Sequence, residues 1–159
     1  MSVTDRLAEL GIALPGVAAP LASYVPAVRA GGLVYTSGQL PMVDGALARS
    51  GKVGGEVSAE DAAALARTCA LNALAAVDAL VGIDNVARVV RVVGYVASDA
   101  GFTGQPGVVN GASELLGEVF GDAGRHARSA VGVAELPLGA PVEVELVVEV
   151  ADRPAVIPA

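Results

Sequence analysis

Residues 126 to 150 read HARSAVGVAELPLGAPVEVELVVEV, a stretch with two strand patterns separated by a segment that contains Pro and Gly. In the second strand, residues 142 to 150, every even position is apolar. Three of its odd positions carry carboxylates: Glu143, Glu145 and Glu149. Because successive side chains point to opposite faces of a strand, the even face is predicted to pack on helices and the glutamates to point away from them.

The first strand of this stretch, residues 128 to 134, opens with a lone arginine. Ser129, Val131 and Val133 suit the side that faces the helices, so Arg128 is predicted to lie on the opposite face, towards water or another subunit. Arginine stays protonated in proteins, and its planar fork matches a carboxylate. Arg128 is therefore our candidate binder of a small carboxylic acid, and a surface or interface salt bridge is the alternative.

Two amphipathic helices precede these strands. The first follows Ser58, with Asp61 as its capping-box partner, and ends at Gly82. The second is predicted over residues 106 to 120, with a proline in its first turn and a glycine after its end. Both show apolar positions every three or four residues, which predicts that one face of each helix packs on a sheet.

Strand signals also cover residues 24 to 30, 33 to 37 and 86 to 97, a short helix is predicted over 4 to 10, and the Gly-rich stretch 44 to 55 is predicted to be a surface loop. Hairpins are expected at Gly31-Gly32 and at Leu138-Gly139. The order β-β-α-β-α-β-β predicts an α/β (α+β) fold, with two helices on one face of a mixed sheet.

The length of 159 residues predicts one domain, 1–159, with a core over 22–150. A net charge of −7 and only 3% aromatic residues make nucleic acid an unlikely partner. Cys69 is the single cysteine and is predicted to pack in the core. The N-terminus lacks a signal sequence and no run of about 18 apolar residues is uninterrupted, so we expect a cytoplasmic protein without a membrane span.

Arg128 and Glu143 are expected to be too far apart to share a small ligand within one chain. A hairpin near residues 137 to 140 would set Glu143 opposite Ala134, roughly 20 Å from Arg128 at about 3.3 Å per residue. A site that uses both residues would then lie between two copies of the chain. The hydrophobic fraction of 53% also favours burial of surface between subunits.

Several short motifs together resemble one known family, over about residues 22 to 150. They are Tyr24, Ala27 to Gly31, Thr36 to Pro41 (TSGQLP), Val109-Asn110, Ala127 to Ser129, Glu135 to Pro137 and Val142 to Glu145. Each motif is weak alone, but their order and spacing are similar to those of the RidA/YjgF family of imine deaminases, also called the endoribonuclease L-PSP family.

The resemblance implies a chorismate-mutase-like fold, related to the ferredoxin-like fold, and a homotrimer with clefts between subunits. It implies hydrolysis of 2-imino acids to 2-keto acids and ammonia, without cofactor or metal. Carried over to this chain, Arg128 would grip the substrate carboxylate and Glu143 would handle the attacking water. The residues that would line the cleft are Tyr24, Ser37, Gly38, Asn110 and Ala130.

The chain departs from the family pattern next to Arg128. His126 stands where the family usually has Pro, and Ala130 stands where many members have Cys. His126 could shuttle protons near neutral pH or have a structural role. Three functions therefore stay open: an imine deaminase, a non-catalytic trimer that binds keto acids, and an endoribonuclease, which the acidic charge disfavours.

Overall fold

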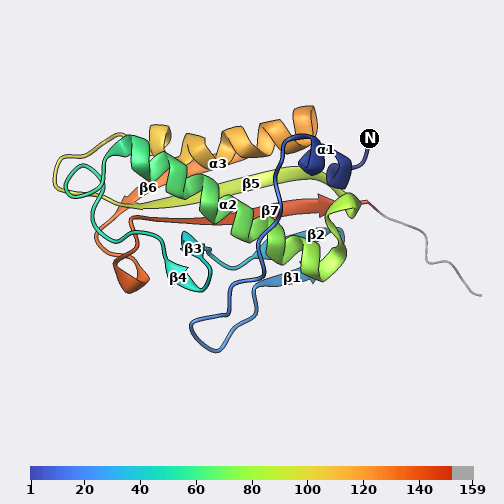
Figure 1. Cartoon of the computed structure of the whole chain (residues 1–159), viewed down its shortest axis with the longest axis horizontal. Coiled ribbons are helices and arrows are strands. Elements are labelled where there is room, and N and C mark those ends of the chain that lie inside the picture. Colours follow the sequence, from blue (N-terminus) through green and yellow to red (C-terminus); the bar gives the residue numbers. More distant parts are fainter. Residues whose placement is uncertain (152–159) are drawn as a thin grey trace, which may run out of the picture.

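The computed structural model describes residues 1–151 of the chain as two helices packed on one face of a five-stranded sheet (Figure 1). The sheet strands are β1 (Ala27–Ala30), β2 (Leu33–Thr36), β5 (Val86–Ala97), β6 (Ala127–Val133) and β7 (Val142–Val150). The covering helices are α2 (Ala59–Val81) and α3 (Gln105–Phe120). A short helix, α1 (Val3–Glu9), and a small hairpin, β3 (Met42–Val43) with β4 (Ala46–Leu47), complete the fold. This arrangement confirms the predicted mixed α+β class.

The strand order β1-β2-β7-β5-β6 contradicts the predicted hairpin at Leu138-Gly139. β6 pairs in parallel with β5, and β7 lies antiparallel between β2 and β5. The α3 crossover joins parallel neighbours, as a β-α-β unit requires. The segment after β6 then crosses the end of β5, where the Ala97 amide donates to the Pro141 carbonyl at 2.9 Å. The turn-like Leu138-Gly139 therefore lies in a segment that crosses the end of β5 and does not form a hairpin.

The first predicted hairpin and the start of α2 are confirmed. Gly31-Gly32 joins β1 to β2, with Ala30 opposite Leu33. The Ser58 hydroxyl accepts from the Asp61 amide at 3.1 Å and so caps α2. The Asp61 carboxylate, however, forms an ion pair with Arg49 at 2.8 Å. It does not make the reciprocal hydrogen bond to the Ser58 amide that a capping box requires.

The predicted surface loop over residues 44 to 55 contains structure that the prediction missed. β3 and β4 are joined by Asp44 and Gly45, whose φ angles of 50° and 80° are both positive. Positive φ at both central residues is typical of the two-residue turn that Asp-Gly favours in β-hairpins. The signal was present in the sequence, but the strands are only two residues each, too short for alternation to reveal them.

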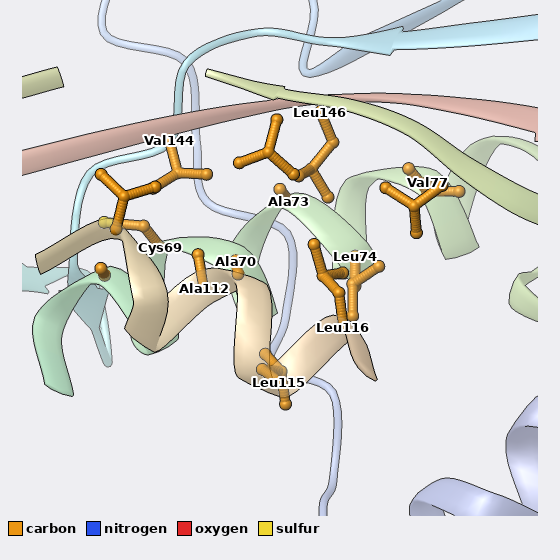
Figure 2. Close-up of a cluster of buried hydrophobic side chains, with 14 of the residues drawn as sticks. Cys69, Ala70, Ala73, Leu74, Val77, Ala112, Leu115, Leu116, Val144 and Leu146 are labelled. Atoms are coloured by element: carbon orange, nitrogen blue, oxygen red, sulfur yellow. The ribbon is translucent and has the colours of Figure 1, made fainter. Parts of the chain in front are cut away.

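The core lies between the two helices and the sheet (Figure 2). Leu74, Leu115, Leu116 and Leu146 are fully buried there among alanines and valines. Cys69 is also fully buried, as predicted, and burial holds the pKa of its thiol well above the usual range. By length and composition α2 could span a membrane, but half of that apolar window is buried in the fold, as in the core helix of a globular domain.

Small residues let α2 and α3 approach closely. A Cβ added at Gly111 of α3 would lie 1.9 Å from the Ala63 carbonyl oxygen of α2, a distance that backbone atoms cannot tolerate. Gly117 of the same helix has no atom within 4 Å of the equivalent position. Gly111 is thus required by helix packing, whereas Gly117 is not.

We predict that Gly111→Ala lowers the free energy of unfolding by about 1–3 kcal/mol, because the helices must move apart. Gly117→Ala is the matched control, and should stabilise by up to about 1 kcal/mol through helix propensity. Urea denaturation of both variants measures the difference. Equal stability of the two variants would contradict the close helix contact.

The N-terminal segment runs from α1 across α2 to the strand that begins at Ala27 (Figure 1). Its helix is held by a capping box between Ser2 and Asp5 and by Thr4, which donates to Asp84 through both its amide and its hydroxyl. Ile12 and Leu14 then pack against the core. This anchored segment places Tyr24 near Gly38, just after the end of β2.

Candidate functional site

Arg128 lies on the face of the sheet that α3 covers, which corrects the prediction that it points away from the helices. In the parallel register Arg128 lies beside Val92, and Val92 lies opposite Leu146; both partners are buried beneath the helices. Residues paired across neighbouring strands point to the same face of the sheet, so Arg128 also points to the helix-covered face. The prediction failed because the bulkier residues of β6, Val131 and Val133, lie on the opposite face, whereas the small Ala130 and Gly132 lie on the face of Arg128 and leave room for α3.

Three oxygens of α3 hold the guanidinium of Arg128. Its Nη1 donates to Asn110 Oδ1 at 2.7 Å and to Ser113 Oγ at 3.2 Å. Its Nη2 donates to the Pro106 carbonyl at 3.3 Å. Asn110 was predicted at the site, and the structure brings it to Arg128. Ser113 was missed, although Asn110 and Ser113 are three residues apart and so form a polar pair on one helix face.

All three acceptors are neutral, so the charge of the half-buried Arg128 has no carboxylate partner within residues 1–151. Its Nε–H donates to no oxygen of that part of the chain. The guanidinium is thus fixed in orientation and retains N–H groups for an incoming anion. A bidentate carboxylate is the ligand that best matches such a fork.

His126 lies immediately before β6 and belongs to the same network. Its Nδ1 is 2.6 Å from the Gly124 carbonyl, and its Nε2 is 2.9 Å from Ser113 Oγ. His126 therefore reaches Arg128 through Ser113. Both ring nitrogens of His126 are engaged, Nε2 with Ser113 of α3 and Nδ1 with Gly124 in the turn before β6. Of the two predicted roles, these contacts favour the structural one over the proton shuttle.

Ala130 follows Arg128 on the same face of β6, beside Gly94 of β5. It is partly buried against the core, and a Cβ at Gly94 would lie 2.3 Å from Val109 Cγ2 of α3. The methyl group of Ala130 therefore packs under α3, next to the guanidinium site. The structure brings together Asn110, Arg128 and Ala130, together with His126.

Glu143 lies on the other face of the sheet, opposite Tyr95 of β5. Burial raises the pKa of its carboxyl group above the usual 4.5, and the negative charge of Glu145 raises it further. Burial also raises the pKa of the Tyr95 hydroxyl, followed by the charge of Glu145. Tyr95 was not predicted; its place opposite Glu143 depends on the β5–β7 register, which the sequence pattern did not reveal.

Gly38 brings the end of β2 to Glu143. Tyr35 pairs with Val147, but Gln39 pairs with Val144, so β2 has one extra residue there, a bulge. A Cβ at Gly38 would lie 1.9 Å from Glu143 Oε1, so only glycine leaves room for the carboxylate. The bulge thus positions the Ser37-Gly38 backbone against Glu143.

Tyr24 and Ser37 lie next to this bulge. The Ser37 hydroxyl donates to the Val25 carbonyl at 2.6 Å, and the Tyr24 hydroxyl accepts from the Leu21 amide at 3.3 Å. Tyr24 and Gly38 line one pocket together with apolar residues of the N-terminal segment and of the loop after β2: Ala18, Ala19, Pro20, Leu21, Pro26, Leu40 and Met42. The pocket has mostly apolar walls, and Gly38, which lines it, lies next to the Glu143 side chain.

The predicted residues therefore form two groups on opposite faces of the sheet. Arg128 and Glu143 are separated by β5 and by three positions along the strands, from Val92 to Tyr95. Strand spacings make this about 14 Å between backbones, with the side chains pointing apart. The earlier estimate of roughly 20 Å rested on the wrong hairpin, but one small ligand still cannot reach both residues of one chain.

A mixed sheet with two helices on one face is the arrangement of chorismate-mutase-like proteins, and this chain has that fold. Residues 4–150 match the family model described as "YjgF/chorismate mutase-like, putative endoribonuclease". The chain belongs to this YjgF family, as the sequence motifs indicated.

Individual relatives agree with this membership. Protein TCP17 of Trypanosoma cruzi is 46% identical over 149 residues, which cover 92% of this chain and 93% of that protein. The crystal structure of Atu1372 from Agrobacterium tumefaciens, a protein of unknown function, is 44% identical with a TM-score of 0.86, covering 94% of this chain and 92% of that one. A structure titled a "putative endoribonuclease" from Shewanella oneidensis is 32% identical with a TM-score of 0.90, covering 94% and 100%.

The raised pKa of Glu143 predicts how stability depends on pH. The folded chain holds this proton more tightly than the unfolded chain, so the stabilisation is complete below the unfolded value of 4.5 and is lost as pH rises through the folded value. The melting temperature of the wild type, relative to Glu143→Gln, should therefore fall as pH rises from 4 towards 8. A constant difference across this range would contradict the raised pKa.

Proposed function

We propose that the protein hydrolyses 2-imino acids to 2-keto acids and ammonia. The observation that carries the proposal is the Arg128 guanidinium, which three neutral oxygens of α3 orient and which has no carboxylate partner among residues 1–151. Such a group supports recognition of a small carboxylate. The family resemblance supports the imine as the reacting group.

In the proposed reaction Arg128 binds the substrate carboxylate and so positions the electrophilic iminium carbon. Water attacks that carbon, and the Glu143 carboxylate accepts one of the water protons. Glu143 then returns this proton to the nitrogen, and as the carbon–nitrogen bond breaks and ammonia leaves, the regenerated carboxylate accepts the hydroxyl proton and the carbonyl forms. The raised pKa of Glu143 supports this role, because a group that exchanges protons is most effective when its pKa is near the working pH.

We further propose that the site is shared between subunits of a homotrimer, with Arg128 from one copy and Glu143 from the next. The placement of these residues on opposite faces of one sheet supports this arrangement. The sheet face without helices also exposes apolar side chains: Val28 at 50%, Tyr35 at 42% and Val131 at 42%. Such an apolar face is well suited to a partner subunit.

The direct test measures hydrolysis of 2-iminobutanoate, formed in situ from an amino acid by an oxidase or a dehydratase. We expect a rate above the spontaneous one. Arg128→Ala should reduce kcat/KM, and Glu143→Gln should reduce kcat by about 10²–10⁴-fold, the usual contribution of a positioned acid–base group. Binding of 2-oxobutanoate by Glu143→Gln without turnover would separate its catalytic role from binding.

Failure to accelerate hydrolysis of several amino-acid-derived imines, with binding of keto acids retained, would favour the metabolite-binding trimer. Endoribonuclease activity, which the names of some relatives suggest, would require RNA cleavage that persists at physiological salt. The net charge of −7 argues against such binding.

Mixed oligomers test whether the site lies between subunits. Arg128→Ala and Glu143→Gln chains, refolded together in equal amounts, should regain about a quarter of the wild-type activity if each site takes one residue from each of two neighbours in a ring. Each variant refolded alone is the control. No recovery in the mixture would place both residues in one chain and contradict the proposed cleft.

The uncovered sheet face makes a separate prediction about assembly. Val131→Asp should shift the protein from trimer to monomer, because a carboxylate would be buried without a partner. Leu80→Asp is the matched control, since Leu80 is 45% exposed but lies on α2, away from that face. Sedimentation velocity measures both, and a Val131→Asp trimer would show that this face is not the interface.

A further inference from the structure

We propose that His126 and Ser113 are positioning residues that hold the Arg128 guanidinium ready for its anionic ligand. This inference rests on the proposed binding role of Arg128, and assigns a function to two side chains outside the family motifs. Both act through Arg128 and neither touches the substrate in this proposal.

With a neutral His126 ring, the hydrogen-bond partners fix the direction of each bond in the network. A carbonyl can only accept, so the Nδ1 of His126 must carry a proton and donate it to the Gly124 carbonyl at 2.6 Å. In the neutral ring Nε2 is then an acceptor, and the Ser113 hydroxyl donates to it across 2.9 Å. With its proton committed to His126, the Ser113 oxygen presents its lone pairs to Arg128 Nη1 at 3.2 Å.

The anchor of this chain of bonds is rigid. Gly124 is buried, and a Cβ there would lie 2.3 Å from the Leu116 carbonyl oxygen, so its backbone is pressed against α3. The same helix carries Ser113 and Asn110. His126 therefore joins the turn before β6 to α3, and fixes the rotation of the Ser113 hydroxyl that would otherwise be free to turn.

These hydrogen bonds fix the orientation of the Arg128 guanidinium. Ser113 and Asn110 together engage both hydrogens of Nη1, and the Pro106 carbonyl accepts from Nη2. The Nε–H and the remaining Nη2–H stay available for a carboxylate. Loss of the Ser113 contact leaves Nη1 with one partner and frees the guanidinium to rotate, so ligand binding must order it again.

The test compares four single variants and one double variant with the wild type. Ser113→Ala removes the relay oxygen, and His126→Phe removes the group that orients it. His126→Gln is the conservative variant, because its amide oxygen can replace Nε2 as acceptor. Thr68→Ala is the matched control, since its hydroxyl donates only to the Ala64 carbonyl within α2 at 3.3 Å and has no link to Arg128.

We expect Ser113→Ala and His126→Phe to weaken binding of 2-oxobutanoate, measured by calorimetry, by about tenfold, the effect of one hydrogen bond to a charged group. KM for the imine should rise by the same factor with kcat unchanged within about twofold, because the carboxylate contact is uniform between ground and transition states. His126→Gln and Thr68→Ala should stay close to the wild type. The double variant Ser113→Ala/His126→Phe should be no worse than Ser113→Ala, since both changes break one relay.

A readout that needs no ligand separates this inference from the proposed function. The Arg128 Nε–H signal in NMR spectra should report a rigid group in the wild type and His126→Gln, and a mobile one in Ser113→Ala. Unchanged mobility and binding in Ser113→Ala would overturn the positioning role even if Arg128→Ala abolishes binding. Increased mobility in Ser113→Ala, in a protein that neither binds 2-oxobutanoate nor hydrolyses imines, would support the relay and reject the proposed function.

Discussion

The parallel pairing of β6 with β5 is the constraint on which the site depends. It follows from α3, which leaves the end of β5 and returns the chain beside the same strand. Because β6 runs parallel at the edge of the sheet, its even positions face α3, and Arg128 meets the oxygens of that helix. β7 is placed on the other side of β5, with its odd positions on the uncovered face, so Glu143 points away from Arg128. One chain therefore presents Arg128 and Glu143 on opposite faces of its sheet.

Local patterns predicted most of the secondary structure, because each depends on neighbouring residues only. The cap at Ser58, the Gly31-Gly32 turn and the alternation in β7 are of this kind. The strand order was not predictable in the same way. Residues 134 to 141 contain the turn-like Leu138-Gly139, and nothing local distinguishes a tight turn from a crossing over the end of β5. The predicted β6–β7 hairpin was wrong for this reason.

The candidate site shows the same division. Arg128 and Glu143 were selected from their residue types and the family motifs, and the contact of Arg128 with Asn110 agrees with that selection. The face of Arg128 was mistaken because alternation shows which residues share a face but not which face the helices cover, and in β6 the valines lie on the face opposite α3. Predicting Ser113 would have required knowledge of the α3–β6 contact, and predicting Tyr95 would have required the β5–β7 register. Both are long-range features of the fold.

The electrostatics of Arg128 and Glu143 support the proposed ligand. Arg128 is a cation held by neutral acceptors, and Glu143 is a carboxyl group whose pKa is raised by burial and by Glu145. Among residues 1–151, Arg128 therefore has no anionic partner and Glu143 has no cationic partner. In the proposed cleft a 2-iminium acid carries both charges, with its carboxylate towards Arg128 and its iminium towards Glu143. The keto acid product keeps the carboxylate but has lost the cation, so its interaction with Glu143 is weaker, and the same charge arrangement that favours substrate binding also favours product release.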